Sequence, residues 1–330
     1  MRRRTIRSAA ALLLALACTV FFTYLAVRDV EFDTVWATLE RCEYLWLVPS
    51  LLLLAAAVYI RALRWGLLFA PSTRPSQRAL LNALLIGYFL NQILPARAGE
   101  AARVVTLHQE AGTSRAEALG TAVAERIYDV MALLLLLFAA APFLPAVTWL
   151  RRAGVLALVL LVVIVITIVV IERYRERPLR FLLRPFARLP GSSIDRTNAA
   201  AANLVHGLGA LHRPRAATAV FLVTLVSWVV AAGSYWFTLV AFDLGLGLRA
   251  ALLIVIATNL ALVIPSLPAA VGVFEAATIL SLAPYGIGRS EALSVAVVLH
   301  AVNFLPFVVA GLFVLQRHSR VLRRRTRLVT

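Results

Sequence analysis

Long apolar runs are the feature that most restricts how this chain can fold. A helix needs about 20 apolar residues to cross the hydrocarbon core of a bilayer, and six runs are that long. Only 15% of the residues carry a charge, whereas soluble domains average roughly 25%. We therefore predict an all-α polytopic membrane protein with about six full transmembrane helices. The runs cover residues 6–27, 46–69, 116–141, 153–171, 216–242 and 291–316.

Arginines mark the sides of the membrane. All 33 basic residues are arginine, and they gather in residues 1–7, 172–215 and 317–330. Cytoplasmic loops carry an excess of Lys and Arg, so we expect both termini inside, in the cytoplasmic (inner) membrane. Residues 28–44 hold five acids against two arginines and are expected outside. The basic charge therefore indicates topology, and no nucleic-acid partner is expected.

One shorter apolar segment cannot be a full crossing. Residue 78 and the basic stretch 172–215 are both expected inside, so the chain between them crosses an even number of times. The runs 116–141 and 153–171 already supply two crossings. Segment 79–94 must therefore enter the membrane and return, which makes "NQILPARAGEAAR" (91–103) the turn and returning arm of a re-entrant hairpin.

A duplicated motif predicts a second hairpin. "LPARAGEAARV" (94–104) resembles "LPAAVGVFEAA" (267–277), and "RAEALGTAVAERIYD" (115–129) aligns without gaps with "RSEALSVAVVLHAVN" (289–303). The flanking spans run in opposite directions, as in transporters built from inverted repeats. Broken helices at membrane depth must be buried in protein or line a polar cavity. The residues expected to shape the two turns are Asn91, Pro95, Gly99, Pro265, Pro268 and Gly272.

These features divide one integral membrane domain, 1–330, into consecutive parts. Its two cysteines have no metal-ligand spacing, and no nucleotide or metalloprotease motif occurs. We therefore expect no cofactor and no metal. The parts are an N-terminal helix and outer loop (1–44), a first repeat (45–171), a basic cytoplasmic linker (172–215), a second, inverted repeat (216–316) and a basic cytoplasmic tail (317–330).

The first hairpin carries a candidate anion site. Arg97, Glu100 and Arg103 are three residues apart, close to one helical face. The new helix after Pro95 also offers free N–H groups, which together with arginine suit a phosphate or another anion. The alternative is an interfacial loop whose arginines reach toward water.

The following span contains further charged candidates. Glu125, Arg126 and Asp129 lie among apolar residues, and charges inside a membrane usually face the bundle interior and mark a functional path. A structural Arg126–Asp129 pair is the alternative. The second half supplies weaker candidates, of which His300 aligns with Arg126 and Asn303 with Asp129. The three candidates of the second half are Glu275, His300 and Asn303.

Two arginines end the second span. Arg61 and Arg64 in "YIRALRW" are predicted at the inner interface. They would either anchor the span there or contact lipid phosphate.

Four segments resemble the lysylphosphatidylglycerol synthase transmembrane-region family, a flippase-like domain. They are "RALRW" (61–65), "NQILPARAGEAAR" (91–103), "ERIYD" (125–129) and "IPSLPAAVGVFEAA" (264–277). The resemblance implies that the chain moves or handles an anionic, aminoacylated or polyprenyl-linked lipid across the inner membrane. Bifunctional members carry an aminoacyl transferase domain after this region. The chain ends at Thr330, so synthase activity is not expected.

Three functions remain open at this point. The leading hypothesis is a lipid translocator that is not an enzyme and whose partners are membrane lipids. A second is a membrane lipid or glycosyl transferase with Asp29, Glu31 or Asp33 as an outward-facing base. A third is an accessory subunit of a separate lipid synthase.

Overall fold

The computed structural model describes residues 2–94, 98–143, 213–262 and 268–327, with scattered residues between 154 and 173. Every regular element in these ranges is helical, as predicted. Pro95, Arg97 and Pro265 lie outside the described residues, as do most of span 153–171 and of linker 172–215.

The described elements form two series of helices. The first is α1 (Arg2–Val27), α2 (Phe32–Glu40), η1 (Tyr44–Trp46), α3 (Leu47–Leu68), α4 (Gln77–Ile93), α5 (Ala98–Ala111), α6 (Arg115–Ala140) and η3 (Ala141–Phe143). The second is α10 (Pro214–Ala241), α11 (Leu248–Ala261), η6 (Pro268–Ala270), α12 (Val273–Leu282), η7 (Ala283–Tyr285) and α13 (Arg289–Arg327).

Five described segments are long and apolar enough to cross a membrane. Four match predicted spans, namely residues 44–68, 115–143, 214–241 and 289–317. The fifth, Pro268–Tyr285, falls on the predicted second hairpin. It reaches 18 residues only by joining α12 to a 3₁₀ turn at each end. The ten residues of α12 span about 15 Å, roughly half the hydrocarbon thickness.

Two helical hairpins occupy the places of the duplicated motif. α4, which ends at Ile93, packs against α5, which begins at Ala98, and α11, which ends at Ala261, packs on α12, which begins at Val273. Ser76 begins α4 by accepting the N–H of Ala79 through its hydroxyl. Near the second turn, Ala269 and Ala270 have φ of 63° and 57°, a left-handed conformation that L-residues seldom adopt. The described part of this turn, from residue 268 onward, is therefore strained.

α3 and α10 form an antiparallel seam through the molecule. At one end the N–H of Glu43 donates to the carbonyl of Ala241 at 2.8 Å, and at the other Arg64 reaches Thr224 at 3.5 Å. Between them the Ser50 hydroxyl donates to the carbonyl of Ser234 at 2.8 Å. Small polar residues at such interfaces allow close approach and bonds between helices in a membrane.

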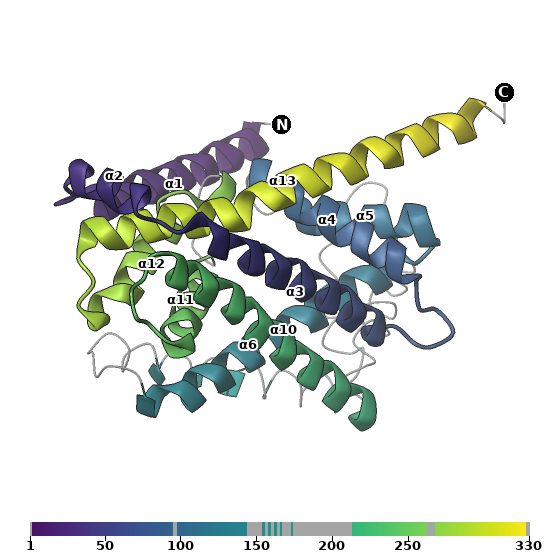
Figure 1. Ribbon diagram of the computed structural model, residues 1–330. Helices are drawn as coiled ribbons and strands as arrows, with labels where there is room; N and C mark the ends of the chain where they lie inside the picture. Colours follow the sequence, from purple (N-terminus) through teal and green to yellow (C-terminus); the bar gives the residue numbers. More distant parts are fainter. Residues whose placement is uncertain are drawn as a thin grey trace.

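The helix contacts repeat between the two halves. α3 packs on α4 as α10 packs on α11, and α5 packs on α6 as α12 packs on α13. Across the halves, α4 packs on α13 as α11 packs on α6. Since the equivalent helices α3 and α10 are antiparallel, this pattern agrees with the predicted inverted repeat. In Figure 1, α3 crosses the middle of the molecule while α13 crosses above it and extends beyond the bundle.

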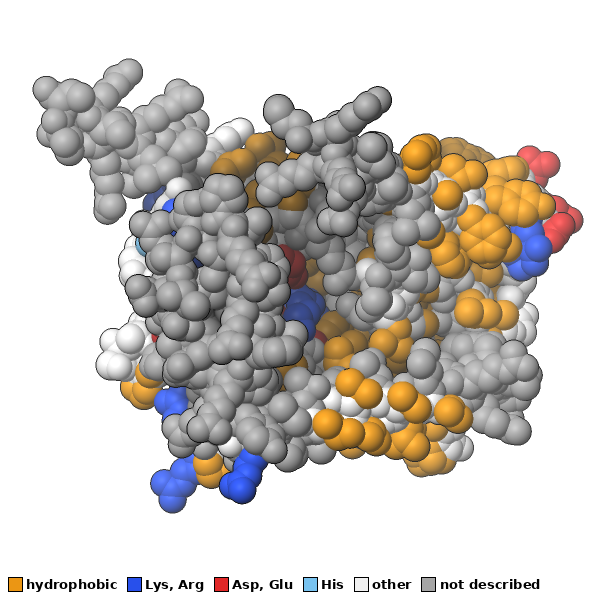
Figure 2. All heavy atoms as spheres, turned by 180° about the vertical axis from the view of Figure 1, so that it is seen from behind, with side chains coloured by type: hydrophobic (Ala, Val, Ile, Leu, Met, Phe, Trp, Pro, Cys, Tyr) orange, Lys and Arg blue, Asp and Glu red, His pale blue; other side chains and the backbone are white. Residues whose placement is uncertain are grey.

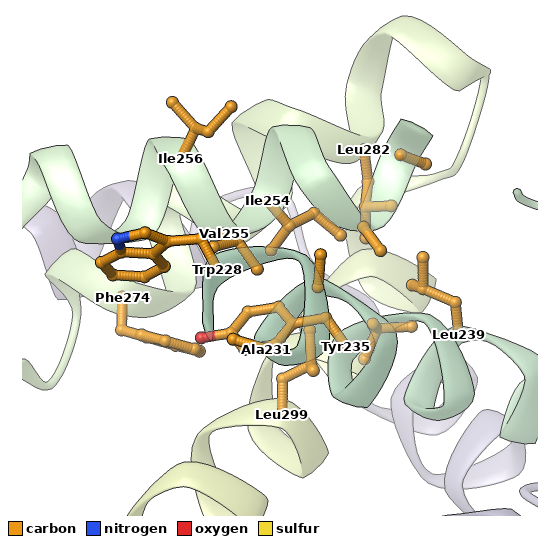
Figure 3. Close-up of a cluster of buried hydrophobic side chains, with 14 of the residues drawn as sticks. Trp228, Ala231, Tyr235, Leu239, Ile254, Val255, Ile256, Phe274, Leu282 and Leu299 are labelled. Carbon is orange, nitrogen blue, oxygen red and sulfur yellow. The ribbon is translucent and has the colours of Figure 1, made fainter. Parts of the chain in front are cut away.

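The main hydrophobic core lies where α10, α11, α12 and α13 meet. Trp228 and Tyr235 of α10 pack with Ile254 of α11, Phe274 of α12 and Leu299 of α13 (Figure 3). These aromatic and branched side chains fill the volume between helices that cross one another. The core therefore holds the second hairpin against α10.

Candidate functional site

Arg64 is fully buried, so the prediction that it lies at the membrane interface is wrong. Its side chain is 0% exposed, and Nη2 lies 2.8 Å from Glu125 Oε1. Nη1 donates to Asp129, whose Oδ1 also accepts the indole N–H of Trp228 at 3.1 Å. The arginine therefore ends inside the bundle, where two carboxylates from α6 compensate its charge.

Arg103 is held in the same way from α5. Its side chain is 2% exposed, with Nε 2.9 Å from Glu100 Oε2 and Nη1 3.1 Å from Glu125 Oε2. The guanidinium also lies over the ring of Trp65, 4.9 Å from its centroid, in a cation–π contact. Arg103 is therefore fixed by its partners and is not a freely available cation.

Arg126 is the most exposed member of this group. Its side chain is 46% exposed, and Nη2 lies 2.8 Å from Glu100 Oε1, a carboxylate that is 32% exposed. Nη1 lies 3.6 Å from Asp129 Oδ2. The predicted Arg126–Asp129 contact exists, but it is longer than the bonds that Arg64 and Trp228 make to Asp129.

Together these residues form what we call the charge cluster. Its three guanidinium groups and three carboxylates balance, so its net charge is zero. Helices α3, α5 and α6 supply the charged groups, and α10 supplies hydrogen-bonding neighbours. Five of the six residues were candidates from sequence, whereas Arg64 was assigned elsewhere. The members are Arg64, Glu100, Arg103, Glu125, Arg126 and Asp129.

Several guanidinium nitrogens near the charge cluster have no hydrogen-bond partner among the described residues. They are Nε of Arg61, Nε of Arg64 and Nη2 of Arg103, all buried. The guanidinium of Arg61 lies over the ring of Trp228, 4.5 Å from its centroid. Buried donors in native proteins normally have a partner, so these groups leave bonding capacity for a ligand or for water.

A close approach of backbones sets the position of the first hairpin. A Cβ added to Gly99 would lie 1.9 Å from the carbonyl oxygen of Gly87, so only glycine fits there. The N–H of Gly99 donates to Asn91 Oδ1 at 2.9 Å, which closes the turn. Asn91 and Gly99 thus place α5, and with it Glu100 and Arg103, against α4 and α6.

The second hairpin has a different chemistry. Glu275 Oε2 accepts the N–H of Gly272 at 2.6 Å, and its Oε1 pairs with Nδ1 of His300. The carbonyl of Asn303 accepts a bond from Gln92 of α4 at 3.4 Å. Pro268 opens the 3₁₀ turn η6, which packs on α4. Gly272, Glu275 and His300 therefore contact one another, whereas Asn303 and the turn that contains Pro268 contact α4. The described contacts of these residues do not include the charge cluster.

Charged side chains also reach the surface, both in a recess of the rear face and around the start of α2. Figure 2 shows charged side chains of both signs in a recess of the rear face, beside a largely hydrophobic surface. Asp29, Glu31 and Asp33, the residues of the transferase hypothesis, are all exposed around the start of α2. Within the described ranges, no group of three or more His, Cys, Asp or Glu side chains could hold a metal ion.

The helices, the repeated contacts and the buried charges define an all-α polytopic membrane protein with a duplicated helical core. The chain belongs to the family described as the lysylphosphatidylglycerol synthase TM region, which it matches over residues 9–311. This is a membrane family linked to lipid handling, as the sequence motifs predicted. No curated protein matches the chain.

Proposed function

We propose that the chain translocates a lipid with an anionic headgroup across the cytoplasmic membrane. In this proposal the headgroup binds at the charge cluster as it crosses. The headgroup would be that of an anionic, aminoacylated or polyprenyl-linked lipid. The observation that carries the proposal is a cluster of six charged side chains, four of them buried, between α5 and the two span-length helices α3 and α6. Each isolated charge at the bilayer centre costs roughly 2.5–3.5 kcal/mol on insertion scales, so such a set is retained for a purpose.

Accessibility assigns different roles within the charge cluster. Arg126 and Glu100 are partly exposed, while Arg64 and Arg103 are buried. We infer that Arg126 makes the first contact with a phosphate oxygen, exchanging its bond to Glu100 for one to the lipid. The unpartnered N–H groups of Arg103 and Arg61 would then donate hydrogen bonds to further headgroup oxygens. The acyl chains would remain in the bilayer.

The direct test is lipid movement in proteoliposomes. The purified chain is expected to accelerate transbilayer movement of a fluorescent anionic phospholipid over that in protein-free vesicles. Arg126→Gln should slow this movement by about tenfold or more, because a hydrogen bond to a charged group contributes roughly 1.5–3 kcal/mol. Arg126→Lys should be slowed less, since it keeps the charge but loses the two-pronged geometry.

Arg249→Gln is the matched control, because Arg249 is exposed on α11 and stacks on Phe143, outside the charge cluster. It should leave the rate unchanged. Movement no faster than in empty vesicles, across lysyl-phosphatidylglycerol, phosphatidylglycerol and a polyprenyl phosphate, would rule out translocation. Copurification of a lipid-modifying enzyme in that case would favour the accessory-subunit function.

A further inference from the structure

A histidine–glutamate pair fastens the start of α12 to α13, apart from the charge cluster. Nδ1 of His300 contacts Glu275 Oε1, while Oε2 of the same carboxylate accepts the N–H of Gly272 at 2.6 Å. The two side chains are only 15% and 12% exposed. Glu275 therefore links the turn of the second hairpin to the helix that follows it.

The first half contains the corresponding pair with a different cation. Arg126 aligns with His300 in the repeat, and it pairs with Glu100 at 2.8 Å. Each glutamate lies in the first turn of the second helix of its hairpin. A guanidinium stays charged at every physiological pH, whereas an imidazole changes charge between about pH 5 and 8. Only the second pair can therefore lose its cation.

The surroundings of His300 are mostly aromatic and apolar. Its ring lies 5.0 Å from that of Phe274 and 6.1 Å from that of Phe304, centroid to centroid. In the described part of the chain, Glu275 is the charged side chain that forms an ion pair with it. Uncharged groups of other helices contact or share a core cluster with α13 residues between Ser294 and Phe307, on either side of His300, and tyrosine is ordinarily neutral at these pH values. They are Tyr88 and Gln92 on α4, Tyr235 on α10, Leu54 on α3 and Val35 on α2.

The turn itself is packed too tightly to shift by small steps. A Cβ added to Gly272, whose φ is 82°, would lie 2.3 Å from Thr23 Oγ1 of α1. The turn beside it, η6, packs on α4 of the other half. In the described structure, η6 and α12 of the second hairpin are seated against α1, α4 and α13.

We propose that His300 and Glu275 form a proton-binding site that holds the second hairpin on α13 while the proton is bound. With one proton, the imidazolium and the carboxylate neutralise each other. When His300 releases that proton to water, the carboxylate keeps only the Gly272 N–H and a neutral imidazole as partners. An uncompensated charge in apolar surroundings is unfavourable, so the hairpin withdraws toward water. This site does not depend on which lipid the protein carries.

The test is thiol labelling of the full-length chain in liposomes as a function of pH. Cys18 and Cys42 are replaced by serine, and Val271→Cys places a reporter at a side chain that is 46% exposed beside the turn. Ala98→Cys, its counterpart in the first repeat, is the matched reporter. Each maleimide labelling rate is divided by the rate for the same thiol in the denatured chain at that pH, which removes the ionisation of the thiol itself.

The corrected rate for Val271→Cys should rise from pH 5 to 8, while that for Ala98→Cys stays constant. The rise is expected because the reporter side chain, 46% exposed in the seated form, becomes more exposed in the withdrawn form. Adding His300→Arg should make the rate low and constant, and His300→Gln should make it high and constant. If His300→Arg does not yield monodisperse protein, Glu275→Gln removes the same ion pair and replaces it as the pH-insensitive variant. A constant rate in the chain with native His300, or an unchanged pH profile in the pH-insensitive variant, would overturn the proposal.

Discussion

Arg64 illustrates at the scale of one residue how burial decides what a charge does. It is fully buried and lies between Glu125 and Asp129. Removing one partner of a buried ion pair leaves the other uncompensated, which costs about 3–5 kcal/mol, whereas an exposed pair contributes about 0–1 kcal/mol. The members of the charge cluster should therefore differ sharply in their effect on stability.

We expect Arg64→Leu to lower the free energy of unfolding by about 3–5 kcal/mol. Arg126→Leu should cost much less, because Arg126 is 46% exposed and water compensates its partners. The double variant Arg64→Leu with Asp129→Leu should recover part of the loss, since the charge left on Asp129 is removed. Denaturant unfolding in detergent micelles measures all three. Equal losses for Arg64→Leu and Arg126→Leu would contradict the assignment.

The sequence could not place Arg64, for a physical reason. A basic residue near the end of an apolar run looks the same whether it reaches the interface or turns into the bundle. Its partners, Glu125 and Asp129, both lie on α6, far along the chain from Arg64. Glu100 and Arg103 could be found from their spacing on one helical face, and Glu125, Arg126 and Asp129 because charges within apolar segments are costly. The Arg126–Asp129 contact was expected, whereas the pairs that join α3, α5 and α6 were not.

Among elements, the first hairpin depends on the contact between α4 and α5. Gly87 and Gly99 bring the two backbones together, and Asn91 closes the turn. The break itself was predictable, because proline and glycine interrupt an apolar run at corresponding positions of two repeats. The closeness of the helices was not, since it depends on which glycine faces which backbone.

Gly99→Ala should therefore disrupt the hairpin and greatly reduce the yield of monodisperse protein, because the new methyl group meets backbone and cannot be accommodated by a side-chain rotation. Gly233→Ala is the control, since a Cβ there meets only the end of Leu53, at 3.0 Å. Size-exclusion chromatography of the two variants at equal expression measures the yield of monodisperse protein. Normal recovery of Gly99→Ala would show that α4 and α5 separate easily.

For the whole molecule, the duplication explains the fold and leaves the two halves chemically unequal. The contacts of α3 to α6 recur in α10 to α13, as the aligned motifs predicted. The charge cluster belongs to the first half, while Glu275 and His300 belong to the second. This inequality is visible in the sequence, because the second motif, residues 267–277, lacks arginine.

Inverted repeats place equivalent turns on opposite sides of the membrane, and this can be measured. In a chain lacking Cys18, Ala111→Cys should react only with cytoplasmic reagent and Gly288→Cys only with reagent from outside. Cys42 can remain, because it is buried and burial raises the pKa of its thiol, so it reacts slowly. Labelling of both positions from one side would refute the opposed orientation of the halves.

The balance of charge in the cluster has an electrical consequence. Three arginines and three carboxylates carry no net charge, so a membrane potential exerts almost no net force on the group as it shifts with its helices. Moving one unbalanced elementary charge across a potential of 100 mV changes its free energy by about 2.3 kcal/mol. Under the proposed function, voltage would act on the lipid headgroup and hardly on the charge cluster. A lipid with one negative charge would be driven toward the positive side, while a zwitterionic one would distribute without regard to the potential.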